Sequence, residues 1–293
     1  MTAGICVFGE VLFDHFPDGR RVLGGAPFNV AWHLQAFGEN PRFLSRIGSD
    51  NEGREVSSAM QEWGMDVRGL QHDDELPTGR VQVSFNEGEP SYEIIHPAAW
   101  DAILPSSAPL SCPWLYHGSL ALRSGTSRNT WRELRIGKVG KVFIDVNLRA
   151  PWFEPELLIE TIKDANWVKL NDHELNYLAP GHAAAEQRAF GFIEKHGIEG
   201  LVLTAGARGA TVLTAAGDVY ESQPANGIVV ADTVGAGDAL AAVMILGLAR
   251  AWPLQLALDR AQEFASEIVR RRGATVADPA FYQALVNGWN RNV

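Results

Sequence analysis

The chain has 293 residues, 46% of them hydrophobic, and a formal net charge of -10 at pH 7. This size and apolar content allow a large buried core, and the acidic balance argues against a nucleic-acid surface, because phosphate backbones are held by basic patches. No apolar run approaches the roughly 20 residues of a membrane span, and the N-terminus lacks the basic and apolar regions of a signal peptide. We therefore expect a cytoplasmic protein.

The chain contains two cysteines, Cys6 and Cys112. Two are too few for a disulfide framework, and no Cys/His spacing is typical of a zinc site. We expect both to be reduced structural thiols.

Short β-rich runs alternate with helical stretches along most of the chain. The pattern predicts strands over 5–8, 42–47, 114–117, 141–144, 167–170 and 201–204, and a helix over 28–37 that Gly38 ends. Such alternation is typical of a mostly parallel sheet with helices on both faces. We predict one α/β domain over residues 1–293.

One interval breaks this alternation. Two β-patterned runs, 79–85 and 91–95, flank a Gly/Pro turn and predict a hairpin. Together with a stretch after the first strand that has its own Pro-Asp-Gly turn, the hairpin could form a small β lid over about 14–24 and 79–96. A decoration at the sheet edge would fit the same pattern.

Residues 232–238 (Asp-Thr-Val-Gly-Ala-Gly-Asp) place a small-residue turn and an acid before an almost wholly apolar run. The run predicts a buried helix whose free N–H groups and dipole favour an anion. Gly235 and Gly237 let the chain turn tightly and let a phosphate approach the backbone. Asp238 would repel an anion, so it indicates a proton-accepting or metal-related role. A turn followed by a capping Asp is the alternative.

A second glycine-rich segment, residues 23–31, also leads into a predicted helix. Asn29 within it, and Asp14 soon after the first strand, are short polar groups suited to hydrogen-bonding hydroxyls. Asp14 could equally be an ordinary loop residue. Two such segments at opposite ends of the chain could clamp two substrates.

Polar residues follow two predicted strands, where ligands of an open parallel sheet lie. Asp145, Asn147 and Arg149 are spaced by two, so they project to one side if the extended conformation persists. Asn171 and Glu174 lie one helical turn apart and could converge on an ion or a water cluster. The same pair could be an N-cap and a first-turn acid.

Residues 204–210 end another predicted strand in a small-residue turn, which could border a flat ring or a ribose, or could simply connect two strands. Several other nucleotide and hydrolase motifs are missing. The sequence has no G-x-x-x-x-G-K-[ST], no G-x-G-x-x-G after the first strand, and no G-x-S-x-G elbow. The missing motifs disfavour a Walker-type site, an NAD-dependent oxidoreductase and an α/β-hydrolase.

Residues 24–31 and 232–238 are similar to the two signatures of the ribokinase-like (PfkB) sugar kinases, and the chain most resembles fructokinases. Segments 9–14, 145–149 and 169–174 also resemble that family. The resemblance implies an α/β fold with a β lid, ATP and Mg²⁺ as co-substrates, and dimers formed through the lids. It also implies a monovalent-cation (K⁺) site near Asp232 and Gly273. The segment 261–265 departs from the family because it lacks an Ala-Asn pair, which bears on adenine contacts.

The resemblance assigns the chemistry to the late glycine turn. Asp238 would take the proton from a sugar hydroxyl, and N–H groups of Gly235, Ala236 and Gly237 would hold the charge on the transferring phosphoryl group. We expect a carboxylate at a helix start to stay ionised and to be a weak base. A loose phosphoryl-transfer transition state tolerates a weak base, because it needs mainly positioning and charge neutralisation.

The resemblance also assigns binding residues. Asp14, Gly24, Gly25, Asn29 and Arg149 would bind the sugar.

Asn171, Thr204, Gly206 and Gly209 would border the nucleotide, and Glu174 would organise Mg²⁺, through water because Mg²⁺ sheds its hydration shell reluctantly. We predict an ATP-dependent sugar kinase, with D-fructose to fructose 6-phosphate as the first candidate reaction. A ribokinase, a 2-keto-3-deoxygluconate kinase, a purine nucleoside kinase and a non-catalytic sensor are the alternatives.

Overall fold

The computed structural model describes residues 4–86, 89–106, 111–225 and 227–291. Its larger sheet has the strand order β13-β12-β11-β10-β9-β8-β1-β4-β5. All neighbours from β5 to β11 are parallel, whereas β12 runs antiparallel to both β11 and β13. The strands are β1 (Ile5–Phe8), β4 (Arg42–Gly48), β5 (Leu70–Asp73), β8 (Ser111–His117), β9 (Lys138–Asp145), β10 (Trp167–Asn171), β11 (Gly200–Thr204), β12 (Ala210–Thr214) and β13 (Val219–Ser222).

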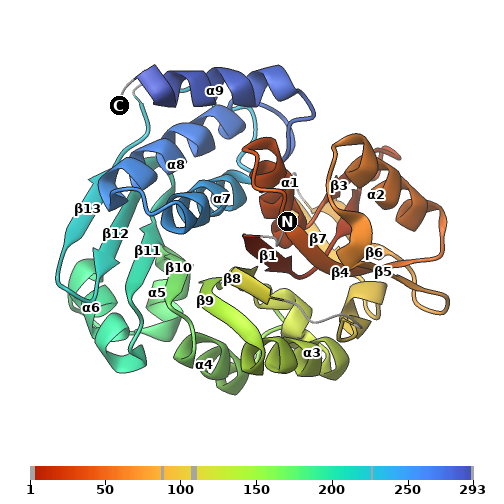
Figure 1. Cartoon of the computed structure of the whole chain (residues 1–293), viewed down its shortest axis with the longest axis horizontal. Coiled ribbons are helices and arrows are strands. Elements are labelled where there is room, and N and C mark those ends of the chain that lie inside the picture. The colour runs from red at the N-terminus through yellow and green to blue at the C-terminus, as the bar shows by residue number, and fades with distance from the viewer. Residues whose placement is uncertain (1–3, 87–88, 107–110, 226, 292–293) are drawn as a thin grey trace.

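Helices cover both faces of this sheet, and each face has its own apolar core. Alternate residues of β1 show why: Ile5 and Val7 belong to one core, and Cys6 and Phe8 to the other. The first core takes α1 (Ala26–Ala36), α2 (Asn51–Glu62), α7 (Ala236–Ala249), α8 (Leu254–Val269) and α9 (Pro279–Arg291). The second takes α3 (Gly125–Ile136), α4 (Pro155–Lys163), α5 (Asp172–Leu178) and α6 (Ala185–His196) (Figure 1).

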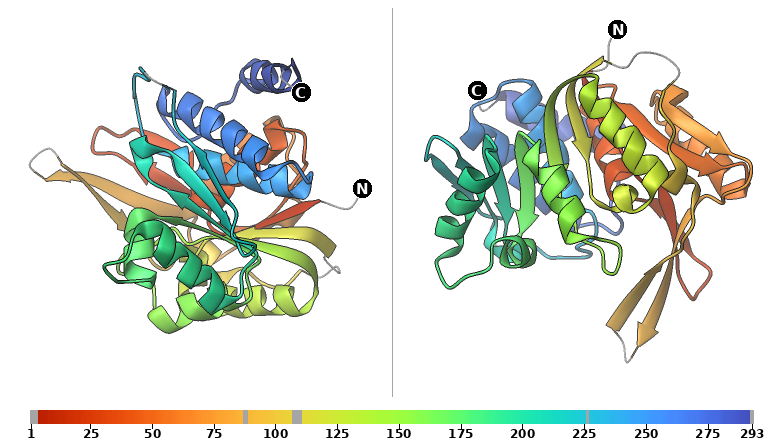
Figure 2. Two further views of the ribbon diagram at one scale, coloured as in Figure 1. Left: turned by 90° about the vertical axis from the view of Figure 1, so that its left-hand side faces the viewer. Right: turned by 90° about the horizontal axis from the view of Figure 1, so that it is seen from below.

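A separate four-stranded sheet has the order β3-β2-β6-β7, with bounds Arg21–Gly24, Leu12–His15, Gly79–Asn86 and Glu89–Ile94. Its β6–β7 hairpin projects from the body of the molecule (Figure 2). The small sheet lies where the sequence predicts it, although residues 87–88 of the expected turn are outside the described part of the chain. Short 3₁₀ turns, Val67–Gly69, Ala99–Ala102, Leu120–Arg123 (η3) and Gly206–Arg208, complete the connections.

The predicted strands and the helix after Gly25 are confirmed, with ends that differ by up to three residues. The expectation of free thiols is wrong. Cys6 and Cys112 form a disulfide, because β1 and β8 are neighbouring parallel strands that bring their Cα atoms to 5.9 Å. The two positions are 106 residues apart in sequence, so spacing alone did not reveal the pairing. No helix in the described part of the chain has the length and apolar character that crossing a lipid bilayer requires.

Candidate active site

Helix α7 begins at a glycine turn whose shape only glycine can adopt without strain. Gly235 is the N-cap with φ at +81°, and a Cβ there would lie 2.4 Å from the Cβ of Ala274. Among the described residues, no side chain caps this helix end. The N–H of Ala236 donates to the carbonyl of Thr233 at 3.3 Å. The start of a long buried helix therefore keeps most of its anion-attracting character.

Asp238, in the first turn of α7, contacts the N-terminal half of the chain. The Nδ2 of Asn29, in α1, donates to Oδ2 of Asp238 at 2.7 Å across 209 residues of sequence. The Oδ1 of Asn29 is buried and has no hydrogen-bond partner among the described residues. Both glycine-rich segments thus meet at one acid, with an unused acceptor beside it.

The carboxyl of Asp238 is a stronger base than the sequence indicates. Burial raises its pKa to about 6, assisted by Asp145 and opposed by the Asn29 hydrogen bond and the charges of Lys169 and Arg149. With a pKa of about 6 the carboxyl is still mostly ionised at pH 7, as expected, but it is a less weak base than an ordinary carboxylate. Desolvation therefore changes the pKa of Asp238 more than its position at the helix start does. The raised pKa favours proton transfer near neutral pH.

A buried ion pair lies next to the glycine turn. The Nζ of Lys169, in β10, donates to both carboxylate oxygens of Asp145 at 2.9 Å. Burial alone would lower the pKa of Lys169, but Asp145 and the other nearby acids leave it raised. A Cβ on Gly237 would lie 3.3 Å from this Nζ, so glycine there makes room for the lysine. Sequence reasoning missed Lys169, although a lysine inside an apolar strand signals a buried partner.

The extended conformation does not continue past Asp145. Strand β9 ends there, and Asn147 adopts a left-handed conformation with φ at +42°. The condition under which Asp145, Asn147 and Arg149 would project to one side is therefore not met, and Asp145 accepts from Lys169 instead. Arg149 is exposed, and its charge lowers the pKa of both Asp238 and Glu10.

Asn171 and Glu174 form a complete capping box at the start of α5. Asn171 Oδ1 accepts from the Glu174 N–H at 2.9 Å, and Glu174 Oε2 accepts from the Asn171 N–H at 2.8 Å. Glu174 Oε1 also accepts from the Leu148 N–H at 2.8 Å. The capping interpretation is confirmed. Burial and the neighbouring Asp145 raise the pKa of Glu174, so a cation there would relieve an excess of negative charge.

The turn after β11 connects two antiparallel strands, as the simpler interpretation has it. Thr204 pairs with Asn171 across β10 and β11. Gly206 and Gly209 both have positive φ, and a Cβ on Gly209 would lie 2.1 Å from the carbonyl oxygen of Ser222. Gly209 therefore already has a structural reason to be glycine, and a nucleotide role for this turn stays a prediction.

Two segments connect the elements of the small and the large sheet next to this site: the crossing from β1 to β2, residues 9–11, and the crossing from β3 to α1, at Gly25. Gly25, the N-cap of α1, has φ at +111°, and a Cβ there would lie 2.7 Å from the carbonyl oxygen of Glu10. Asp14 is part of β2 rather than a loop, and burial raises its pKa to about 6. Gly24 ends β3 opposite Leu12, two residues before Asp14 in β2. Asp14, Gly24 and Gly25 of the predicted sugar-binding residues therefore lie close together, whereas Asn29 lies in α1 and Arg149 follows β9.

Residues 5–280 match the pfkB family carbohydrate kinases. The chain belongs to this family. It is an ATP-dependent phosphotransferase, and the meeting of Asn29 with Asp238 places the family's two signatures side by side.

Relatives of the kinase include an aminoimidazole riboside kinase and fructokinases. The chain is 29% identical over 296 residues to aminoimidazole riboside kinase of Salmonella typhimurium, covering 94% of this chain and 92% of that protein. It is 30% identical over 265 residues to a fructokinase of Salmonella typhimurium, with 85% of each chain covered. The crystal structure of a Vibrio cholerae fructokinase with fructose, ADP and calcium bound superposes with a TM-score of 0.80 at 25% identity, covering 96% of this chain and 98% of that one.

Within the described residues of the kinase, no cluster of three His, Cys, Asp or Glu side chains could hold a metal ion. A metal that keeps its waters and binds ATP phosphates needs fewer protein ligands, so the single carboxylate of Glu174 is compatible with Mg²⁺. Asp232 uses both carboxylate oxygens on the N–H groups of Val234 and Gly273, at 3.1 Å each. The K⁺ site near Asp232 stays a prediction.

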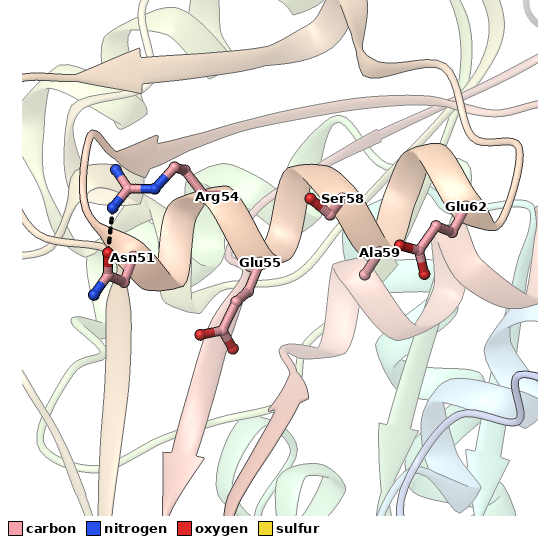
Figure 3. Close-up of a pocket in the computed structure, with 6 residues that line it drawn as sticks. All are labelled: Asn51, Arg54, Glu55, Ser58, Ala59 and Glu62. Atoms are coloured by element: carbon pink, nitrogen blue, oxygen red, sulfur yellow. Dashed lines mark hydrogen bonds between the residues drawn. The ribbon is translucent and has the colours of Figure 1, made fainter.

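A surface hollow of about 470 Å³ lies along α2 of the kinase (Figure 3). Its lining comes from this one helix: Asn51, Arg54, Glu55, Ser58, Ala59 and Glu62. Because the lining includes none of the site residues above, we assign the hollow no part in the reaction.

Proposed function

We propose that the kinase transfers the γ-phosphate of ATP to a hydroxyl of D-fructose and forms fructose 6-phosphate. The observation that supports this proposal most is the hydrogen bond between Asn29 and Asp238. It joins the helix that follows the expected sugar-binding segment to the acid beside the expected phosphate-binding turn. The likeness to fructokinases supports the choice of fructose.

In this proposal Asp238 accepts the proton of the attacking hydroxyl. Asn29 occupies Oδ2, which leaves Oδ1 for the hydroxyl, and the free Oδ1 of Asn29 can accept from a second hydroxyl of the sugar. Backbone N–H groups at Gly235, Ala236 and Gly237 neutralise the charge of the transferring phosphoryl group. For Ala236 to take part, its 3.3 Å contact with Thr233 must open.

Mg²⁺ would supply charge neutralisation at the ATP phosphates. Glu174 would hold it through water, because one lone pair of each carboxylate oxygen is already used by a backbone N–H. Asn171 keeps Glu174 in place through the capping box.

A riboside is the second candidate acceptor. The aminoimidazole riboside kinase matches this chain over 94% of its length, a larger share than the fructokinase matches. A coupled ADP-release screen across fructose, ribose, aminoimidazole riboside, adenosine and 2-keto-3-deoxygluconate decides between the candidates. Fructose should give the highest kcat/KM, and a preference of tenfold or more for another acceptor would overturn the choice of fructose.

We also propose that the small sheet is a lid that pairs with a second copy of this chain. Phe85 and Tyr92 lie on the same face of the β6–β7 hairpin as the buried Val83, yet they are 55% and 57% exposed. An exposed apolar strip on a projecting hairpin is typical of an interface. Sedimentation of the wild type and of a Phe85→Ser/Tyr92→Ser variant tests this, and a wild type that is monomeric at micromolar concentration would contradict it.

A further inference from the structure

An unused acceptor lies buried at the crossing from β1 to β2. Glu10 is 3% exposed, and its Oε2 has no hydrogen-bond partner among the described residues. Burial raises the pKa of Glu10 to about 7, although a hydrogen bond from its own backbone N–H and the charges of Arg149 and Arg123 lower it. A buried carboxylate oxygen without a partner costs stability, so a ligand that donates to it would relieve that cost.

An unused donor lies buried at the end of η3. Arg123 donates from Nε and Nη2 to the two carboxylate oxygens of Asp101 at 2.7 and 2.8 Å. Its guanidinium is stacked between the rings of Trp100 and Trp152, at 4.0 and 4.3 Å. The side chain is 3% exposed, yet Nη1 has no partner in the described ranges. Arg123 is thus held in place while the two N–H bonds of its Nη1 have no acceptor among the described residues.

Both groups lie near the junction of the large and the small sheet. The carboxyl of Glu10 interacts electrostatically with Arg149, with Arg123 and with the proposed base, Asp238. Arg123 also donates to the carbonyl of Ile95 at 3.1 Å, just after β7, where the chain leaves the small sheet. Glu10 therefore lies at this junction between β1 and β2, and Arg123 lies at it beside the segment that follows β7.

We propose that Glu10 and Arg123 form a hydroxyl-reading pair that selects an uncharged polyhydroxylated sugar over a sugar acid. A sugar hydroxyl both donates and accepts, so two of them can satisfy Glu10 Oε2 and Arg123 Nη1. A sugar carboxylate would instead meet the carboxyls of Glu10, Asp14 and Asp238. Asp101 already neutralises Arg123, which leaves Arg149 as the compensating charge. This inference rests on the proposed function.

The test measures kcat and KM for fructose, for its monodeoxy analogues and for 2-keto-3-deoxygluconate. The variants are Glu10→Gln, which conserves shape, and Arg123→Lys, which keeps the charge but removes the guanidinium fork. Arg132→Lys is the matched control, because Arg132 makes the same two-pronged contact with Glu160 on an exposed helix face. Calorimetric titration with each sugar, and thermal melting, accompany the kinetics.

Both site variants should raise the KM and Kd for fructose roughly 10- to 100-fold, the worth of a hydrogen bond to a charged group, with kcat and the KM for ATP little changed. Each variant should also lose discrimination against one monodeoxy analogue, an effect that a purely structural role would not produce. Unchanged fructose affinity and discrimination in folded Glu10→Gln and Arg123→Lys would overturn the inference, as would a wild-type preference for the sugar acid. A wild type that binds fructose through this pair without transferring phosphate would overturn the proposed function alone.

Discussion

Helices α5 and α7 begin with the same pattern, an acid at the third helical position, yet they use it differently. At α5 the acid is Glu174, whose oxygens accept from backbone N–H groups of its own helix start and of Leu148. At α7 the acid is Asp238, which turns away from its helix and contacts Asn29 in the other half of the chain. One helix start is capped by its own side chains, and the other has no side-chain cap among the described residues.

The residue at the N-cap explains this difference. Asn171 at α5 has a side chain that caps, whereas Gly235 at α7 has none and takes a left-handed conformation. An acid near a helix start therefore does not by itself identify a catalytic group. An acid that accepts from backbone N–H groups at its own helix start serves as a cap, whereas an acid whose hydrogen bonds go to another element is a candidate base.

The largest expected effect comes from Asp238→Asn. The amide keeps an acceptor for Asn29 but cannot take a proton, so kcat should fall roughly 10²- to 10⁴-fold. Melting temperature and ATP affinity should stay near wild type. Steady-state ADP release measures the loss, and a kcat within threefold of wild type would remove Asp238 from the mechanism.

Substitutions of the two N-cap residues, Gly235 and Asn171, should lower the free energy of unfolding by different amounts. Gly235→Ala forces a Cβ into a left-handed position against Ala274, so it should cost about 2–5 kcal/mol of unfolding free energy. Asn171→Ala removes one cap and should cost about 0.5–2 kcal/mol. Urea unfolding of both variants compares them, and a larger loss at Asn171 would contradict the account of the glycine turn.

Sequence patterns predicted the α/β fold class, six strands of the larger sheet and the two glycine-rich segments, but not β5, β12 or β13. Apolar runs located the strands, and the two glycine segments located Asn29 and Asp238. The sequence patterns did not predict contacts between buried residues that are far apart in the chain. The Cys6–Cys112 disulfide follows from the order of the strands in the sheet. Glu10 lies between β1 and β2, in a segment whose sequence is typical of a loop. The pKa of Asp238 depends on desolvation, which a local helix-start rule does not contain.

Glu174→Gln should act on both stability and magnesium use. An amide nitrogen would face one of two backbone N–H donors, so we expect a loss of about 1–3 kcal/mol and a higher Mg²⁺ concentration for half-maximal activity. A magnesium titration at saturating ATP measures this shift. An unchanged titration with lowered stability would leave Glu174 with its capping role only.

A smaller effect is expected in the pH profile. The pKa of Asp238 is about 6, and the ionised form is the base, so kcat should decline as the pH falls below about 6. The Asn29 hydrogen bond lowers this pKa, so Asn29→Ala should move the acidic limb to higher pH. Rates measured from pH 5 to 9 test both statements, and an acidic limb that stays in place in Asn29→Ala would break the link between the two residues.

The most direct test of the central claim is a single-turnover experiment with enzyme in excess over ATP and with saturating fructose at pH 8. The wild type should convert bound ATP to sugar phosphate within one turnover time. Asp238→Asn should hold the ATP uncleaved over that time. Sugar phosphate forming at the same rate in both proteins would show that the acid beside the glycine turn does not take the hydroxyl proton.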